Sequence, residues 1–158
     1  MTSPANPTSA GAPVLQGAAV DAVQQALAAE HAAEWCYDLV MAFLTTKALQ
    51  ENAARDALAH QARRDATERM LRDAGATPAS AQPAYRAEVT DEPSAIALLV
   101  TVEADAAVAW RGVLERTEDP ELRRRALAAL VESATRGARW RKTAGSDPMT
   151  VPFPGQPA

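Results

Sequence analysis

AVDAVQQALAAEHAAEWCYDLVMAFL, residues 19 to 44, decides the fold class, because its apolar and charged side chains recur at alternating steps of three and four. This spacing places residues on one face of an α-helix, whereas a strand would alternate at every second residue. The recurring residues are Val20, Val23, Leu27, Glu30, Glu34, Tyr37, Met41 and Leu44. The pattern predicts a helix from about Gly17 to Lys47 with glutamates on its core-facing side.

A second helix is expected from about Glu51 to Ala74, because Gly75 is a typical residue just beyond a helix end. Its predicted buried stripe contains Ala57, His60, Arg64, Thr67 and Leu71. The segment from Thr77 to Glu92 contains prolines and favours an irregular crossover, longer than a tight helix hairpin needs.

Two more helices complete the predicted fold. The third begins near Asp91 or Ser94, either of which can cap it, and continues to about Arg116. Its predicted buried stripe contains Ile96, Leu99, Glu103, Ala106, Trp110 and Val113. The fourth runs from Pro120 to about Thr143. The sequence therefore predicts an all-α, antiparallel four-helix bundle over residues 15–145, with a longer crossover between the second and third helices.

The two ends of the chain differ from the bundle in composition. Residues 1–14 contain prolines and no periodicity, and are expected to form a disordered arm. Residues 146–158 contain four prolines, so this tail is expected to be non-helical and to pack on the bundle through Val151 and Phe153.

Composition excludes several classes of protein. A net charge of −4 makes nucleic acid an unlikely partner, and Cys36 is the only cysteine, so no disulfide can form within the chain. We find neither a secretory signal nor a stretch of uncharged apolar residues long enough to cross a membrane. A cytoplasmic protein is expected.

Charged residues occupy positions on all four helices where the pattern would otherwise place core residues. Glu30 and Glu34 lie on the first helix and Glu103 on the third. An ionised carboxylate away from water costs several kcal/mol unless it meets cations or donors. The candidates for this role are His60 and Arg64 on the second helix and Arg136 on the fourth. Glu132 is a further charged residue of the layer, four residues before Arg136, and could bond it within the helix, just as His60 and Arg64 are four residues apart. His31 follows Glu30 directly and is expected to face solvent.

Five segments give the chain a resemblance to the ferritin-like superfamily, and more closely to an alanine-rich, ferritin-like family of uncharacterised actinobacterial proteins. They are AEHAAEWCYDL from Ala29, HQARRDATERML from His60, VEADAAVAWRGVL from Val102, ESATRGARWR from Glu132, and PFPG from Pro152. This resemblance implies the same bundle fold over about Leu15 to Phe153.

The resemblance also implies a comparison with the dimetal centre of ferritin-like proteins, which places one Glu on each of two helices and Glu-x-x-His on the other two. Glu30 and Glu103 match the single glutamates. The other two motifs are broken, since Arg63 follows His60 by three residues and Thr135 follows Glu132 by three. Arginine stays protonated and repels a dication, so Arg64 and Arg136 are expected to replace the metal charge in a buried ion-pair network.

Three functional interpretations follow from this network. The favoured one is a non-enzymatic bundle without a cofactor, used for protein interaction or assembly with an unknown partner or as a homodimer formed through a helix face. The alternative is a metal-binding or redox protein that holds iron or manganese with Glu30, Glu34, His60, Glu103 and Glu132. A third interpretation is a small anionic ligand bound by Arg64 and Arg136 in a cleft between helices.

Overall fold

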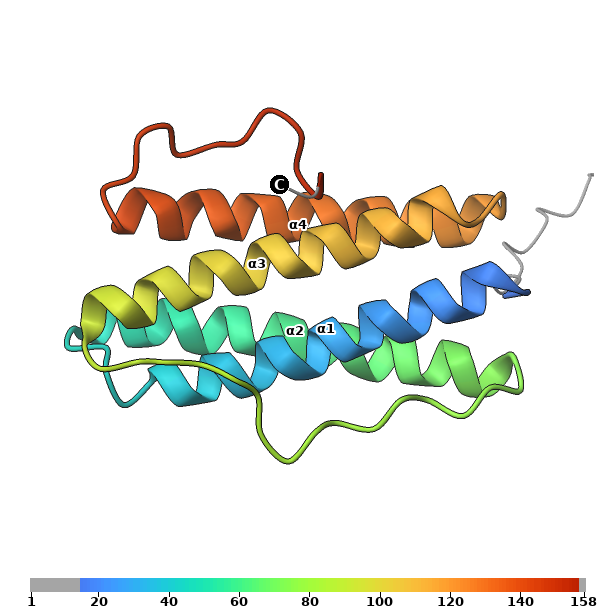
Figure 1. Ribbon diagram of the computed structural model, residues 1–158, viewed down its shortest axis with the longest axis horizontal. Coiled ribbons are helices and arrows are strands. Elements are labelled where there is room, and N and C mark those ends of the chain that lie inside the picture. Colours follow the sequence, from blue (N-terminus) through green and yellow to red (C-terminus); the bar gives the residue numbers. More distant parts are fainter. Residues whose placement is uncertain (1–14, 157–158) are drawn as a thin grey trace, which may run out of the picture.

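The computed structural model describes residues 15–156, and these form a four-helix bundle (Figure 1). The helices are α1 (Ala18–Val40), α2 (Lys47–Asp73), α3 (Glu92–Glu115) and α4 (Pro120–Thr143). The predicted fold class is confirmed, and the predicted ends of α4 agree with the structure. The predicted disordered arm, residues 1–14, lies outside the described residues.

The first helix is shorter than predicted. It ends at Val40, and α2 begins at Lys47, where the Thr46 hydroxyl accepts a hydrogen bond from the backbone N–H of Leu49 at 3.3 Å. Threonine is a good N-cap because its side-chain oxygen satisfies a backbone donor of the first turn. Leu44 is buried although it lies in the connecting turn. The apolar spacing therefore continued past the true end of α1.

The order of the helices explains the long crossover. The α1–α2 and α3–α4 pairs are antiparallel hairpins, while α2 and α3 run in the same direction (Figure 1). A chain joining two parallel helices must return along the whole bundle, which residues 74–91 do beside α1 and α2. The side chain of Gln24 on α1 holds this crossover, since it donates to Thr77 O at 2.7 Å and accepts from Ala79 N at 2.8 Å.

His31 is covered by the same crossover. Its side chain is buried, and its Nε2 lies 3.1 Å from Ala79 O. The prediction that His31 faces solvent is therefore wrong, because helix periodicity alone does not reveal that a loop lies over the outer face of α1.

The core has two apolar clusters separated by a polar layer. One cluster, near the start of α1, includes Leu27, Leu71 and Leu122, and the other, near its end, includes Val40 and Leu99. Buried alanines occur on all four helices, where their short side chains let the backbones approach closely. The polar layer between the clusters contains the candidate site.

The C-terminal tail turns back along α4 (Figure 1). Gly155 makes its closest approach to the bundle, since a Cβ atom there would lie 2.6 Å from Ala107 O on α3. The expected anchors, Val151 and Phe153, are 42% and 71% exposed. The contact therefore depends on a small residue with close backbone approach instead of on apolar anchors.

By length and hydropathy, α3 would be able to cross a membrane, and it is the one helix of residues 15–156 that would. In the bundle, 44% of its most apolar window is buried against the other helices. Leu99 and Val113 of α3 belong to the core. A helix that is buried in a core is rich in apolar residues, so its composition resembles that of a membrane span.

Candidate functional site

Five charged side chains meet in the polar layer: Glu30 from α1, His60 and Arg63 from α2, Glu103 from α3 and Arg136 from α4. We call this set the buried polar centre. Glu30, His60 and Glu103 have no exposed surface, and Arg136 is 5% exposed. Arg63 is 10% exposed. All four helices therefore contribute charge to one site, in which the two carboxylates and the imidazole are closed to bulk water.

His60 joins the two carboxylates. Its Nδ1 lies 2.7 Å from Glu30 Oε2 and its Nε2 lies 3.0 Å from Glu103 Oε1. Ionised carboxylates only accept hydrogen bonds, so both ring nitrogens must carry protons to satisfy them. Burial by itself lowers the pKa of His60, but the bonds to Glu103 and Glu30 outweigh it and hold that pKa above its ordinary value. His60 is therefore a buried imidazolium.

Glu30 is bound by three donors from two other helices. Besides His60, it accepts from Arg63 Nη1 at 3.1 Å and from Trp110 Nε1 at 2.6 Å. Burial by itself raises the pKa of Glu30, whereas His60 and Arg63 lower it, and the net direction is downward. Glu30 therefore stays ionised in an interior that would otherwise protonate it.

Glu103 is also bound by three donors, and all three bind the same oxygen. Oε1 accepts from Tyr37 Oη at 2.6 Å, from Arg136 Nε at 2.8 Å and from His60. Burial raises the pKa of Glu103, but His60 and Arg136 outweigh that effect, so the pKa is lowered. The other oxygen, Oε2, has no hydrogen-bond partner among the described residues.

Two predicted members of the network lie at its edge. The prediction that Arg64 belongs to the centre is wrong, because Arg64 pairs with Glu34 and Asp65 at the rim of α1 and α2. The side chains of Arg64 and Glu34 are 22% and 24% exposed. Arg63, one residue earlier, enters the centre instead.

Glu132 also departs from its predicted place. Its side chain is 58% exposed, and it accepts a bond from Arg63 Nη2 at 2.7 Å from the surface of α4. The inward position of this turn is taken by Ser133, whose hydroxyl accepts from Arg63 at 3.1 Å. The observed facing of α4 therefore differs from the predicted one by one residue, or about 100° around the helix. Glu132 lies outside the core as a result and binds the outer end of the Arg63 side chain.

A polar branch that no spacing pattern indicated leaves the centre through aromatic residues. Trp140 Nε1 lies 2.9 Å from Tyr37 Oη and 3.1 Å from Asp56 Oδ2, and Arg139 binds Asp56 at 3.0 Å. Tyr37 and Trp110 belong to the predicted core-facing stripes, and Trp140 is buried as well. Each of these side chains has one polar atom, which needs a hydrogen-bond partner once the ring is buried. This requirement is the signal by which the sequence could have indicated the branch.

The donor set does not fit the iron or manganese centre expected from the ferritin-like resemblance. Such a centre needs several carboxylates and neutral imidazoles, whereas His60 is protonated and Arg63 and Arg136 place two further cations beside the carboxylates. In the centre, only Glu103 Oε2 remains free of hydrogen bonds from the described residues, and one oxygen does not make a coordination sphere. Within residues 15–156 no group of three or more His, Cys, Asp or Glu side chains is arranged to hold a metal ion.

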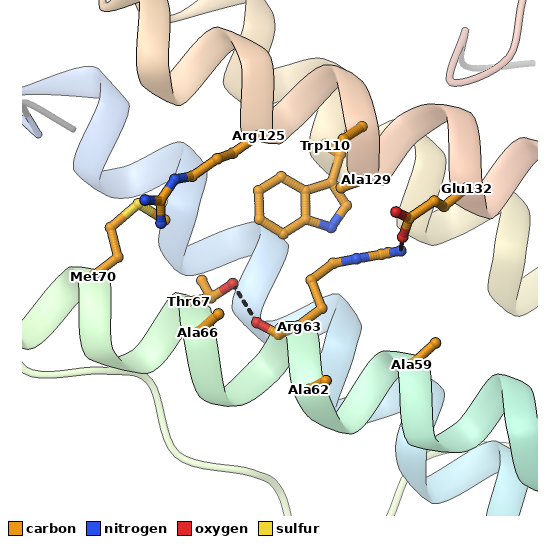
Figure 2. Close-up of a pocket in the computed structure, with 11 residues that line it drawn as sticks. Ala59, Ala62, Arg63, Ala66, Thr67, Met70, Trp110, Arg125, Ala129 and Glu132 are labelled. Carbon is orange, nitrogen blue, oxygen red and sulfur yellow. Dashed lines mark hydrogen bonds and ion pairs between the residues drawn. The ribbon is translucent and has the colours of Figure 1, made fainter. Parts of the chain in front are cut away.

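The described residues do not form the anion cleft expected for Arg64 and Arg136 either. Arg64 is occupied by Glu34 and Asp65, and Arg136 lies buried on Glu103. A large cleft lies instead between α2 and α4, which pack less closely on each other than the other neighbouring helices do. Figure 2 shows it lined by alanines from both helices, with Trp110 between them.

Comparison with known proteins places the chain in a family. Residues 22–158 match the family described as "Domain of unknown function (DUF4439)". The chain belongs to the DUF4439 family. Among solved structures it is similar to a conserved hypothetical protein, rv2844, from Mycobacterium tuberculosis, with 34% identity and a TM-score of 0.77. That match covers 81% of this chain and 98% of the other.

The DUF4439 match and the mycobacterial structure fit the expected family of uncharacterised actinobacterial proteins. No curated protein matches the chain. The family is described without an activity, and the similar mycobacterial protein is described as a conserved hypothetical protein. Function therefore has to be argued from the geometry of this chain.

Proposed function

We propose that this DUF4439 protein is a non-enzymatic helical module that acts through protein interaction or assembly. The observation that carries the proposal is the closed state of the buried polar centre. Its acidic and basic side chains are bonded to one another, and the carboxylates are out of contact with solvent. Acid–base or nucleophilic chemistry needs a carboxylate, imidazole or nucleophile that a substrate can reach, and Glu30, His60 and Glu103 have no exposed surface.

In this proposal the scaffold is ferritin-like and the centre replaces a dimetal site. Ferritin-like bundles have one long crossover connection, and the passage of residues 74–91 along the bundle supports that relation. His60, Arg63 and Arg136 supply three positive charges between Glu30 and Glu103, which is the charge role that two metal ions have elsewhere. The centre then fixes the register of the four helices.

The surface proposed for assembly is the outer face of α4, and α2 has a further exposed apolar residue. Leu58, Leu127 and Val131 are 64%, 52% and 55% exposed, and they are large apolar residues on these two helices. Leu127 and Val131 lie four residues apart on one face of α4. Exposed apolar side chains that gather on one face favour association with a second surface, and we propose a second copy of the chain.

Sedimentation and light scattering test this assembly. The expected result is a homodimer that Val131→Asp converts to a monomer, because a carboxylate would be buried in the interface. Val108→Asp is the control, since Val108 is 36% exposed on α3 and should leave the dimer intact. A wild-type chain that stays monomeric at every concentration would contradict self-assembly.

The rival function is metal binding or redox chemistry with Glu30, Glu34, His60, Glu103 and Glu132. Against this rival, Glu34 and Glu132 lie at the edges, Glu30 and Glu103 are each paired with an arginine, and His60 lies between those two carboxylates with both ring nitrogens bonded. Elemental analysis of protein made in metal-rich, chelator-free medium separates the two. We expect less than about a tenth of an equivalent of iron, manganese or zinc, and a full equivalent would replace our proposal with the rival.

A further inference from the structure

The cleft between α2 and α4 has the dimensions and lining of a small-molecule site. Its volume is about 520 Å³, within the range of ligand pockets. Ala62 and Ala66 from α2 and Ala129 from α4 form its walls, and their short side chains leave the space open (Figure 2). The indole ring of Trp110 lies at the floor between them.

The middle of the cleft offers no hydrogen-bonding side chain to a ligand. The Thr67 hydroxyl donates to Arg63 O at 2.8 Å, and the Trp110 indole N–H donates to Glu30 at 2.6 Å. Both polar atoms are therefore used within the protein. A ligand lying over this region would contact methyl groups and an aromatic ring, so its body must be apolar.

The two ends of the cleft differ in charge. At one end Arg63 is fully engaged, since it contacts Glu30, Glu132 and Ser133. At the other end Arg125 reaches across from α4 and lies beside Met70 (Figure 2). Arg125 Nε donates to Glu121 at 2.9 Å, but Arg124 pairs with the same carboxylate. Glu121 is therefore shared between two guanidinium groups, and it holds Arg125 through Nε, while the Nη groups of Arg125 make no hydrogen bond within residues 15–156.

We propose that this cleft binds a medium-chain amphipathic carboxylate, with its carboxylate on Arg125 and its apolar chain over Trp110 and the alanines. A guanidinium group presents paired N–H donors that match the two oxygens of a carboxylate, and the Nη groups of Arg125 are available for this pairing. The site goes beyond the proposed assembly, because Leu127 and Val131 can associate without anything in the cleft.

Titration calorimetry with decanoate, decanol and decylamine tests the chemistry of the ligand. Decanoate should bind one per chain, decanol at least about tenfold more weakly and decylamine not measurably, because only the carboxylate can pair with Arg125. Absence of decanoate binding below its micelle concentration, or equal binding of decylamine, would overturn the proposal.

A pair of arginine variants locates the carboxylate. Arg125→Gln should weaken decanoate binding by about tenfold or more, since a charge-assisted pair is lost. Arg124→Gln is a matched control, because Arg124 pairs with the same Glu121 but is 67% exposed and does not line the cleft. Equal losses in the two variants would assign the effect to general surface charge and refute the site.

Filling the cleft locates the apolar chain. Ala66→Phe should abolish decanoate binding, and Ala62→Phe, at a more exposed wall position, provides a second variant if the first does not fold. Folding is checked by circular dichroism.

Repeating the titration with Val131→Asp separates the ligand site from the proposed assembly. Decanoate binding to that variant supports the ligand site whatever the oligomeric state of the variant. Unchanged binding to a folded, filled variant would exclude this cleft.

Discussion

At the residue scale, the position of one arginine decides how the centre is neutralised. Arg63 and Arg64 follow His60 by three and four residues, and both spacings lie on the same side of a helix. In the structure Arg63 is 10% exposed and links Glu30 to Glu132, while Arg64 remains at the rim. The stabilisation of the buried carboxylate therefore depends on Arg63.

Arg63→Ala should lower the free energy of unfolding by about 3 to 5 kcal/mol, because it leaves Glu30 buried with one cation fewer. Arg64→Ala should cost less than about 1 kcal/mol, since it breaks a partly exposed pair. Urea unfolding of the two variants measures this difference. Equal losses would mean that the two arginines share the central role.

The titration of His60, Glu30 and Glu103 predicts an optimum in stability. The pKa of His60 is raised above its ordinary 6.5, so its contribution is complete below pH 6.5 and is lost as pH rises through the higher folded value. The pKa values of Glu30 and Glu103 are lowered from 4.5, so their contribution is complete above pH 4.5 and is lost as pH falls through the lower folded values. Stability should therefore be greatest between pH 4.5 and 6.5.

Thermal melts across pH measure this profile. His60→Gln should flatten the decline on the alkaline side, because the ionisable ring is removed. His31→Gln, which changes the other histidine at a site away from both glutamates, should keep it. A wild-type protein whose stability rises steadily above pH 6.5 would contradict a protonated His60.

At the element scale, the tail depends on the absence of a side chain at Gly155. This residue has φ of +77°, and a Cβ atom would collide with Ala107 O at 2.6 Å. Gly145, at the end of α4, has φ of +71° and nothing within 4 Å of an added Cβ. The two glycines have similar backbone conformations and differ in their surroundings.

Gly155→Ala should release the tail from α3 and α4, because it adds a collision with backbone to the ordinary cost of positive φ. Gly145→Ala has that ordinary cost alone and should leave the tail in place. Amide hydrogen exchange of residues 149–156 follows the release. Unchanged protection in Gly155→Ala would show that other contacts hold the tail.

At the scale of the whole molecule, the buried polar centre connects side chains from all four helices. In the proposed function, this centre folds without a cofactor. Chelators should therefore shift the unfolding temperature by no more than about 1 °C. A protein stabilised by bound metal would instead lose the stabilisation that metal binding gives to the folded state. A large drop after dialysis against a strong chelator would show that an ion contributes to the fold.

The helical pattern of the sequence determined much of the fold. Pro120 and Asp91 marked the starts of α4 and α3, since proline suits a first turn and aspartate caps one, and Asp91 forms a capping box with Ser94. Glu30, His60, Glu103 and Arg136 were placed in one layer because polar residues on an apolar stripe need each other. These are local properties of the chain, which periodicity and capping chemistry report directly.

Only the tertiary structure decided which of two neighbouring residues on a helix points into the core. The choice of Arg63 over Arg64 and of Ser133 over Glu132 depends on how α2 and α4 are rotated in the bundle, and a helix allows both rotations. The burial of His31 depends on a crossover distant in sequence. Contacts between helices and loops set these positions, because each residue's partners come from elements whose relative placement the local spacing of the chain does not encode.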